Sequence, residues 1–238
     1  MADDDEVPLS LPSPSRVAAR AHALLTQAYR SFLEGAADDP RAASEHARCL
    51  AWCERVGLRR ELEPREWEIL STPLGALSQR EAVNAGWCLE AAALLAWALG
   101  RIEILDYEEQ QNGVAIAQAM GFLDAEARAL PAEVSLRSRD ELDHCLSTYL
   151  ALHWRLRSFS LRPEPLDFAA FVRDCTWGDL SLDGLRLVDG DLSLGGVPLS
   201  KASEAAYRTC ASIASERHRA AEWLLGQHPL YSEVTADT

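Results

Sequence analysis

Residues 78–100 read SQREAVNAGWCLEAAALLAWALG, a long and almost entirely apolar stretch of this 238-residue chain. Within residues 82–99 only Asn84 and Glu90 carry polar side chains. This composition predicts one helix that is apolar on every side. Such a helix needs neighbouring elements on every side, so we expect it to stand at the centre of a helical domain.

The ends of this stretch carry the signals of a helix start and a helix stop. Ser78 and Glu81 fit a capping box, in which both side chains accept hydrogen bonds from backbone amides at the helix start. Gly100 suits the left-handed residue that closes a helix. The sequence therefore sets both ends of the central helix as well as its burial.

The rest of the chain is also mainly helical in pattern. Apolar residues at helical spacing predict further long helices near residues 16–34, 42–56, 138–158 and 201–225. Between residues 180 and 199 apolar and polar residues alternate, and Asp-Gly and Gly-Gly pairs lie at turn positions. The predicted fold class is mainly α: a multi-helix single domain around a buried central helix (about 78–100), with a small antiparallel β-hairpin or meander (about 180–199).

Charge separates the two predicted parts of the chain and restricts its partners. Residues 1–14 are acidic and then proline-rich, and we expect them to be flexible, with residues 15–238 forming the single domain. The formal net charge of −14 argues against nucleic acid or an anionic membrane as partner and favours a basic protein. No apolar signal peptide opens the chain, so we expect a cytoplasmic location.

The motifs of the common enzyme and metal-binding classes are missing from the sequence. It contains no GxxxxGK[ST], GxGxxG, GxSxG or HExxH motif, and its six cysteines lack zinc-ligand spacing. We expect the cysteines to be reduced thiols in the core. We predict no metal, no cofactor and no catalytic residue, and an enzyme is the less favoured interpretation.

Glu90 is the most informative polar residue, because helical spacing places it on the same apolar line as Val83 and Leu94. An ionised carboxylate there must be paired or hydrogen-bonded. Arg217 lies on the apolar face of the last long helix, which makes a buried Glu90–Arg217 ion pair our first interpretation. Arg155 is the next candidate partner, and a functional site built on Glu90 is the alternative.

Other titratable side chains lie on predicted helices. His153 is on an apolar helix face, where a hydrogen-bonded core histidine is the first interpretation and a general base or ligand the alternative. If three helices meet at one depth, these groups form a polar pocket for a small anion or for acid–base chemistry. The candidate binding residues are Glu90, His153, Arg155, Glu216, Arg217 and His218.

Several motifs follow one another along the chain: EPREW at 63–67, WCLEA and LAWALG between 87 and 100, LD and YLALHWRLR between 142 and 157, and ERHRA, WLLG and VTADT between 216 and 238. In order and spacing they resemble the bacterial domain-of-unknown-function family 4272, over about residues 45–238. The first fourteen residues lie outside this resemblance. It implies a mainly helical domain with a small strand insertion, and it brings no known activity, catalytic residue or cofactor. The motifs include all six candidate binding residues.

Two classes of function fit these observations. The first is a cytoplasmic acidic binding protein without catalytic activity, such as an immunity or antitoxin-like protein that masks a basic partner protein. The alternative is an enzyme or small-ligand binder, which requires the candidate residues to line a solvent-connected cavity. An oligomeric scaffold is a third possibility.

Overall fold

The structure, a computed structural model, describes residues 11–103, 106–131, 134–226 and 228–235. The α-helices among these residues are α1 (Pro14–Gly35), α2 (Pro40–Arg55), α3 (Pro64–Ser71), α4 (Gln79–Ala98), α5 (Gly113–Met120), α6 (Arg139–Leu161), α7 (Phe168–Asp174) and α8 (Glu204–Leu224). The strands are β1 (Leu187–Val188), β2 (Asp191–Leu194) and β3 (Val197–Pro198). Short 3₁₀ helices occur at Leu58–Arg60, Leu199–Lys201 and Tyr231–Glu233.

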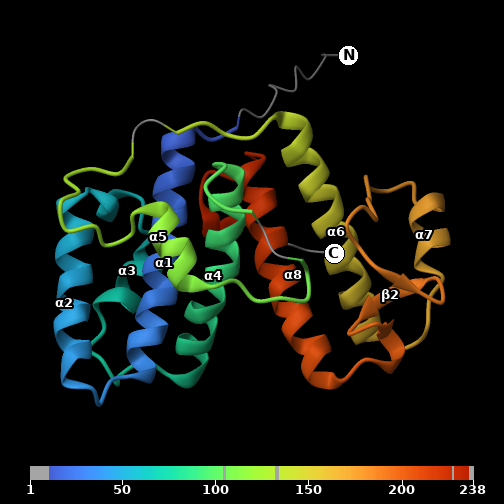
Figure 1. Cartoon of the computed structure of the whole chain (residues 1–238), viewed down its shortest axis with the longest axis horizontal. Coiled ribbons are helices and arrows are strands. Elements are labelled where there is room, and N and C mark those ends of the chain that lie inside the picture. Colours follow the sequence, from blue (N-terminus) through green and yellow to red (C-terminus); the bar gives the residue numbers. More distant parts are fainter. Residues whose placement is uncertain (1–10, 104–105, 132–133, 227, 236–238) are drawn as a thin grey trace, which may run out of the picture.

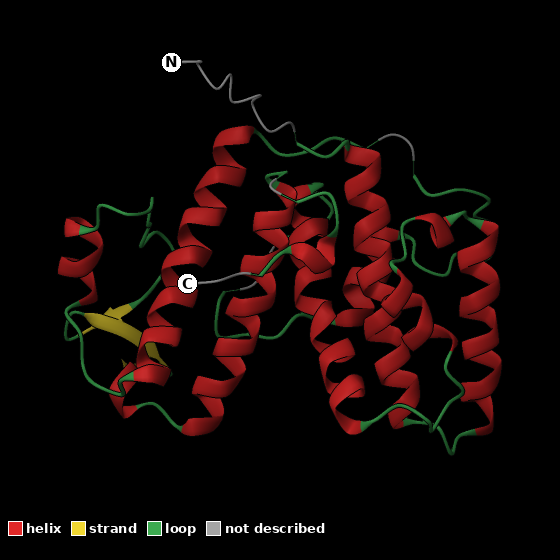
Figure 2. Ribbon diagram, turned by 180° about the vertical axis from the view of Figure 1, so that it is seen from behind, coloured by secondary structure: helices red, strands yellow, loops and turns green. Residues whose placement is uncertain are grey.

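The long helices stand side by side in an order that differs from their order in the chain. Figure 1 shows α2, α1, α4, α8 and α6 in succession, with the small sheet and α7 beyond α6. The last helix, α8, is thus inserted between α4 and α6, and the view from behind shows the same arrangement (Figure 2). The predicted mainly α fold with a small antiparallel sheet is confirmed.

Helix α4 begins and ends as the sequence predicts. Ser78 Oγ accepts a hydrogen bond from the Glu81 amide at 3.3 Å, and Glu81 Oε2 accepts one from the Ser78 amide at 2.8 Å. Gly100 has a φ of +65°, the left-handed conformation that glycine adopts without strain. The capping box therefore fixes the start of the helix, and the glycine turns the chain away at its end.

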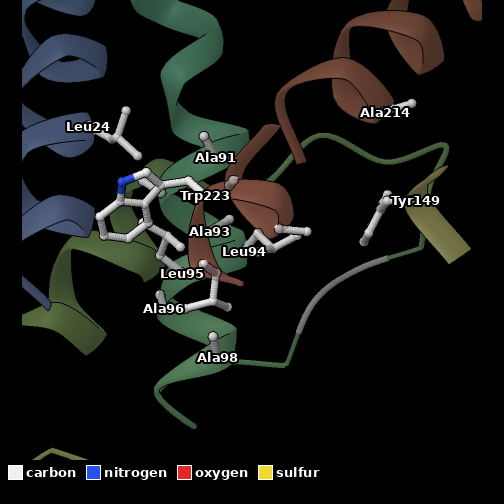
Figure 3. Close-up of a cluster of buried hydrophobic side chains, with 14 of the residues drawn as sticks. Leu24, Ala91, Ala93, Leu94, Leu95, Ala96, Ala98, Tyr149, Ala214 and Trp223 are labelled. Carbon is white, nitrogen blue, oxygen red and sulfur yellow. The ribbon is translucent and has the colours of Figure 1, made fainter. Parts of the chain in front are cut away.

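The burial of α4 is uneven along its length. Ala91 to Ala96 are all fully buried, whereas Val83 near the start is 51% exposed. In Figure 3 the apolar side chains of α4 lie against Leu24 of α1 and Trp223 of α8. The many alanines of α4 let these neighbouring helices approach closely. The prediction of a helix buried on every side thus holds for the second half of α4 and is wrong for its first turns.

The sheet is a three-stranded antiparallel meander in the order β1-β2-β3. Asp189 and Gly190 join β1 to β2 with φ angles of +54° and +81°, which suit the tight turns of hairpins. Residues 180–182, which the alternating pattern included, form no strand. The sheet therefore occupies only the second half of the predicted region.

The N-terminal boundary differs slightly from the prediction. Helix α1 begins at Pro14 with Ser13 as its cap, and Leu11 already packs against the core. Residues 1–10, which make up most of the segment expected to be flexible, lie outside the described residues. Cys49, Cys53 and Cys210 are buried as expected, while Cys88, Cys145 and Cys175 are half-buried.

Candidate functional site

Glu90 and Arg217 form an ion pair in the middle of the molecule, as the sequence predicts. Arg217 Nη2 and Nε donate to Glu90 Oε2 at 2.7 and 3.0 Å. The side chains of Arg217 and Glu90 are 0% and 2% exposed. The pair joins α8 to α4 across 127 residues of sequence, and its charges compensate each other where neither could stay alone.

The same pair also holds the connection between α4 and α5. Arg217 donates to the Tyr149 hydroxyl at 2.9 Å and to the carbonyl oxygens of Asp106 and Glu109 at 3.3 and 3.1 Å. The Gln111 amide donates to Glu90 Oε1 at 2.8 Å. Burial opposes the charged guanidinium, but Tyr149 and Glu90 outweigh it, so the pKa of Arg217 is raised. Both ions are thus stabilised by hydrogen bonds beyond their own contact.

His153 of α6 and His218 of α8 contact each other. Their Nδ1 atoms are 3.0 Å apart, so one ring donates and the other accepts. Burial lowers the pKa of His153 to about 4, with Arg157 and Arg219 adding to the effect. Burial lowers the pKa of His218 to about 3, and His153 lowers it further. The pair is therefore a neutral hydrogen-bonded link between two helices, which agrees with the first interpretation of His153.

Arg155 does not reach Glu90, and its expected role as the next candidate partner is not realised. Its Nε and Nη2 donate to the two carboxylate oxygens of Asp191 at 2.7 and 2.6 Å, and Nη2 also donates to the Glu164 carbonyl at 3.1 Å. Arg155 follows His153 by two residues, so its side chain leaves α6 about 200° further round the helix. It therefore faces the sheet rather than α8.

Glu216 lies apart from these contacts. Its Oε1 is 3.7 Å from Nη1 of Arg219, and its side chain is 17% exposed. Burial raises the pKa of this carboxyl, Arg219 offsets the rise in part, and the charge of Glu90 adds to it. The charge of Glu216 in turn acts on Cys88 of α4 and on Tyr231 in the C-terminal segment.

The six candidate residues consequently divide into separate groups instead of lining one pocket. Consecutive residues of a helix are about 100° apart, so Glu216, Arg217 and His218 leave α8 in three directions. Glu90 also lines a hollow of about 320 Å³ together with residues of α1, α4 and the connection that follows α4. The other residues that line it are Ser31, Val83, Gly86, Trp87, Leu89, Gln110 and Gln111.

An acidic cleft lies at the α6 end of the helix row, between α6, α7 and residues 179–183. It has a volume of about 640 Å³. Its charged lining comprises four aspartates and one arginine, namely Asp140, Asp143, Asp179, Asp183 and Arg173. Arg173 contacts Asp174 at 3.1 Å and Asp143 is paired with Arg139 at 2.8 Å, so the negative charge of the cleft comes mainly from Asp140, Asp179 and Asp183.

Polar contacts hold the walls of this acidic cleft together. Ser147 Oγ donates to Asp179 Oδ2 at 3.1 Å, and the Ser181 amide donates to the Ser147 carbonyl at 3.2 Å. His144 Nε2 lies 3.5 Å from Asp183 Oδ2. Sequence reasoning missed the cleft because its acids come from two segments some 40 residues apart, and nothing in their spacing shows that they meet.

Neither a metal site nor a membrane span emerges from the described residues. Within them, no group of three or more His, Cys, Asp or Glu side chains is placed to hold a metal ion. No helix in the described part of the chain is long and apolar enough to cross a membrane. The prediction of no metal and no cofactor stays a prediction.

Fold and site together define a mainly helical protein in which buried ion pairs join α4 to α8 and α6 to the sheet. The chain belongs to the family described as Domain of unknown function (DUF4272), whose model matches residues 2–169. The match begins at residue 2, so it covers nearly all of the N-terminal segment that the sequence resemblance left out, and it ends before the ERHRA motif of α8. No curated protein and no solved structure matches the chain.

Proposed function

We propose that this protein is a binding protein without catalytic activity that takes up a basic segment of a partner protein in its acidic cleft. The observation that carries the proposal is the cleft between α6, α7 and residues 179–183, which is lined by four aspartates and one arginine. Three of them, Asp140, Asp179 and Asp183, are exposed. Exposed carboxylates around a hollow attract Lys and Arg side chains and speed their encounter.

The buried groups support this proposal by what they already bind. The carboxylate of Glu90 accepts hydrogen bonds from Arg217 and from the Gln111 amide, so its bonding capacity serves the fold. Arg155 is likewise engaged by Asp191. A binding function for the exposed charged residues is therefore better supported than one for the buried charged residues.

The proposal extends to cellular setting and partner type. A net charge of −14 favours a basic protein over nucleic acid or an anionic membrane. We place the protein in the bacterial cytoplasm, and an immunity or antitoxin-like role, in which it masks a cationic toxin, is the form of the function that this charge favours.

A titration with a lysine-rich twelve-residue peptide tests the proposal. Amide chemical shifts should change mainly in residues 139–147 and 179–183, and the affinity should fall as salt is added. The double variant Asp140→Asn/Asp183→Asn should weaken binding, by about 0.2–1 kcal/mol for each exposed charge pair lost.

The matched control removes the same charge at the far edge of the helix row. Asp38→Asn/Glu54→Gln replaces two exposed acids outside the cleft and should leave the affinity nearly unchanged. If both double variants weaken binding equally, or if shift changes scatter over the surface, the acids serve solubility alone and the proposal is wrong.

A second candidate function is a small-ligand site at Glu90. The hollow of about 320 Å³ that Glu90 lines with Trp87, Gln110 and Gln111 favours it, because an aromatic wall and amide side chains suit a small polar ligand. Glu90→Gln separates the two roles: the variant loses stability if Glu90 is a framework carboxylate and gains stability if Glu90 is a ligand-binding group kept at a cost in stability.

A further inference from the structure

An apolar pocket lies far from the acidic cleft, between α1, α5 and the turn that follows α5. Its volume is about 720 Å³, and apolar and aromatic side chains make up most of its lining. Leu25, Tyr29 and Phe32 line it from α1, and Val114 and Ala117 line it from α5. In Figure 1 these helices lie at the α2 edge of the row, whereas α6 and α7 lie at the other.

The rim of this apolar pocket exposes large apolar side chains. Phe32 is 69% exposed and Val114 is 67% exposed. The ring of Tyr29 stacks on Phe32 at 6.2 Å and meets Phe122 edge-on at 5.7 Å. Exposed apolar groups that gather around a hollow are typical of binding sites, and aromatic walls favour a ring-containing ligand.

The charges at the pocket are nearly all compensated. Arg48 lines the pocket, and its Nη2 lies 2.5 Å from Glu45 Oε2. The Tyr29 hydroxyl donates to the same carboxylate oxygen at 2.8 Å. The other charged side chain in the lining is that of Asp124, whose Oδ1 accepts a hydrogen bond from the Glu126 amide at 2.9 Å. An anionic ligand would meet no free cation in this lining, so the pocket suits an uncharged molecule.

The backbone at the pocket is held in shape without a ligand. Leu123 has a φ of +60°, a conformation that leucine adopts only when its surroundings impose it. Arg48 Nη1 donates to the Leu123 carbonyl at 3.3 Å, and Leu123 itself packs in the smaller core cluster with Trp52. The backbone of Gly113 packs closely against Leu89, because a Cβ atom added at Gly113 would lie 3.4 Å from the Leu89 side chain. The wall is therefore built before any ligand arrives, as is usual for small-molecule sites.

We propose that the apolar pocket between α1 and α5 binds a small, uncharged molecule that carries an aromatic ring. Its aromatic lining, exposed rim and compensated charges point to this class of ligand. The site is independent of the acidic cleft, so either binding function can fail while the other holds.

Fluorescence titration with N-phenyl-1-naphthylamine, a neutral aromatic probe, tests the site on the full chain. We expect saturable enhancement with one probe bound per chain. Three competitors that share the naphthalene ring system but differ in charge then test the ligand class: 2-naphthalenemethanol, 2-naphthoate and 2-naphthylmethylammonium. The neutral alcohol should displace the probe best.

Two variants locate the bound probe. Ala117→Phe fills the pocket from α5 and should weaken binding by about tenfold or more, equivalent to about 1.4 kcal/mol. Ala115→Phe adds the same ring to an exposed position of the same helix and should leave the affinity unchanged. Phe32→Ala removes a ring that is 69% exposed, so it leaves the fold intact, and it should weaken binding by about fivefold.

Several outcomes would overturn the proposal. They are no saturable enhancement, equal affinity in Ala117→Phe and Ala115→Phe, or preferred displacement by either charged competitor, 2-naphthoate or 2-naphthylmethylammonium. The alternative occupant of the pocket is a second copy of the chain, which sedimentation can detect as a dimer. A dimer that Phe32→Ala dissociates would show that a second copy covers the pocket.

Discussion

Arg217 and Arg155 are both buried arginines held by a carboxylate, yet they fasten different parts of the molecule. Arg217 joins the two central helices α4 and α8 and the connection after α4. Arg155 joins α6 to the edge of the fold, where Asp191 begins β2 and also accepts the Leu166 amide at 3.2 Å. A similar ion pair thus supports the whole core in one place and a peripheral unit in the other.

The first prediction removes the carboxylate of the central pair. Glu90→Gln leaves the Arg217 guanidinium buried without its counterion, so the free energy of unfolding should fall by about 3–5 kcal/mol. Denaturant unfolding followed by circular dichroism measures this loss. Glu216→Gln is the matched control on α8. Burial already raises the pKa of this carboxyl, so its loss should cost under about 1 kcal/mol. Equal losses would contradict the central role of the Glu90–Arg217 pair.

The second prediction removes the carboxylate of the peripheral pair. Asp191→Asn should loosen the sheet and α7 locally while α4 and α8 stay protected, because local units open below the global free energy. Amide hydrogen exchange should therefore speed up in residues 187–198 and leave α4 unchanged. Asp189→Asn is the control, since asparagine tolerates the same left-handed turn. Faster exchange throughout α4 would show that the sheet is part of the central core.

The third prediction concerns the His153–His218 contact between α6 and α8, whose effect on stability is smallest at neutral pH and grows with acid. Both histidines have lower pKa values in the folded chain, about 4 and about 3, than the ordinary value of about 6.5. Below pH ~6.5 the unfolded chain therefore binds more protons, and each histidine should cost about 1.4 kcal/mol of stability per pH unit.

Thermal unfolding between pH 7 and pH 4.5 checks this contribution. His153→Gln should flatten the fall in stability with acid, whereas His144→Gln, at an exposed position, should change it little. An unchanged slope in His153→Gln would mean that the pair carries no proton linkage.

The two arginines also show how far sequence alone reaches. The Glu90–Arg217 pair was predictable because helical periodicity places both residues on apolar faces of long helices, where each needs a partner. The partner of Arg155 was not, because Asp191 lies in a short strand after a turn, and no periodicity gives its depth. Both arginines and Glu90 were identified from the sequence, whereas Asp191 was not, because the sequence shows where a residue lies around its helix but not which element it will meet.

The surface hollows were beyond prediction for a related reason. Inserting α8 between α4 and α6 depends on which apolar faces pack together, and helical periodicity identifies each apolar face without identifying its partner. The acidic cleft depends on residues 179–183 folding back to α6, where Ser147 holds Asp179. The apolar pocket depends on α5 and the strained Leu123. These features follow from tertiary contacts that no local pattern encodes.

The central claim is that Glu90 belongs to the framework and is not a ligand-binding group. A double-mutant cycle of Glu90→Gln and Arg217→Met, read as free energies of unfolding, tests it most directly. The account predicts that each single variant loses stability and that the double variant loses less than the two combined, with a coupling energy on the order of 2 kcal/mol. If instead Glu90→Gln is more stable than the parent protein and the coupling is near zero, Glu90 is a ligand-binding group kept at a cost in stability, and the account is contradicted.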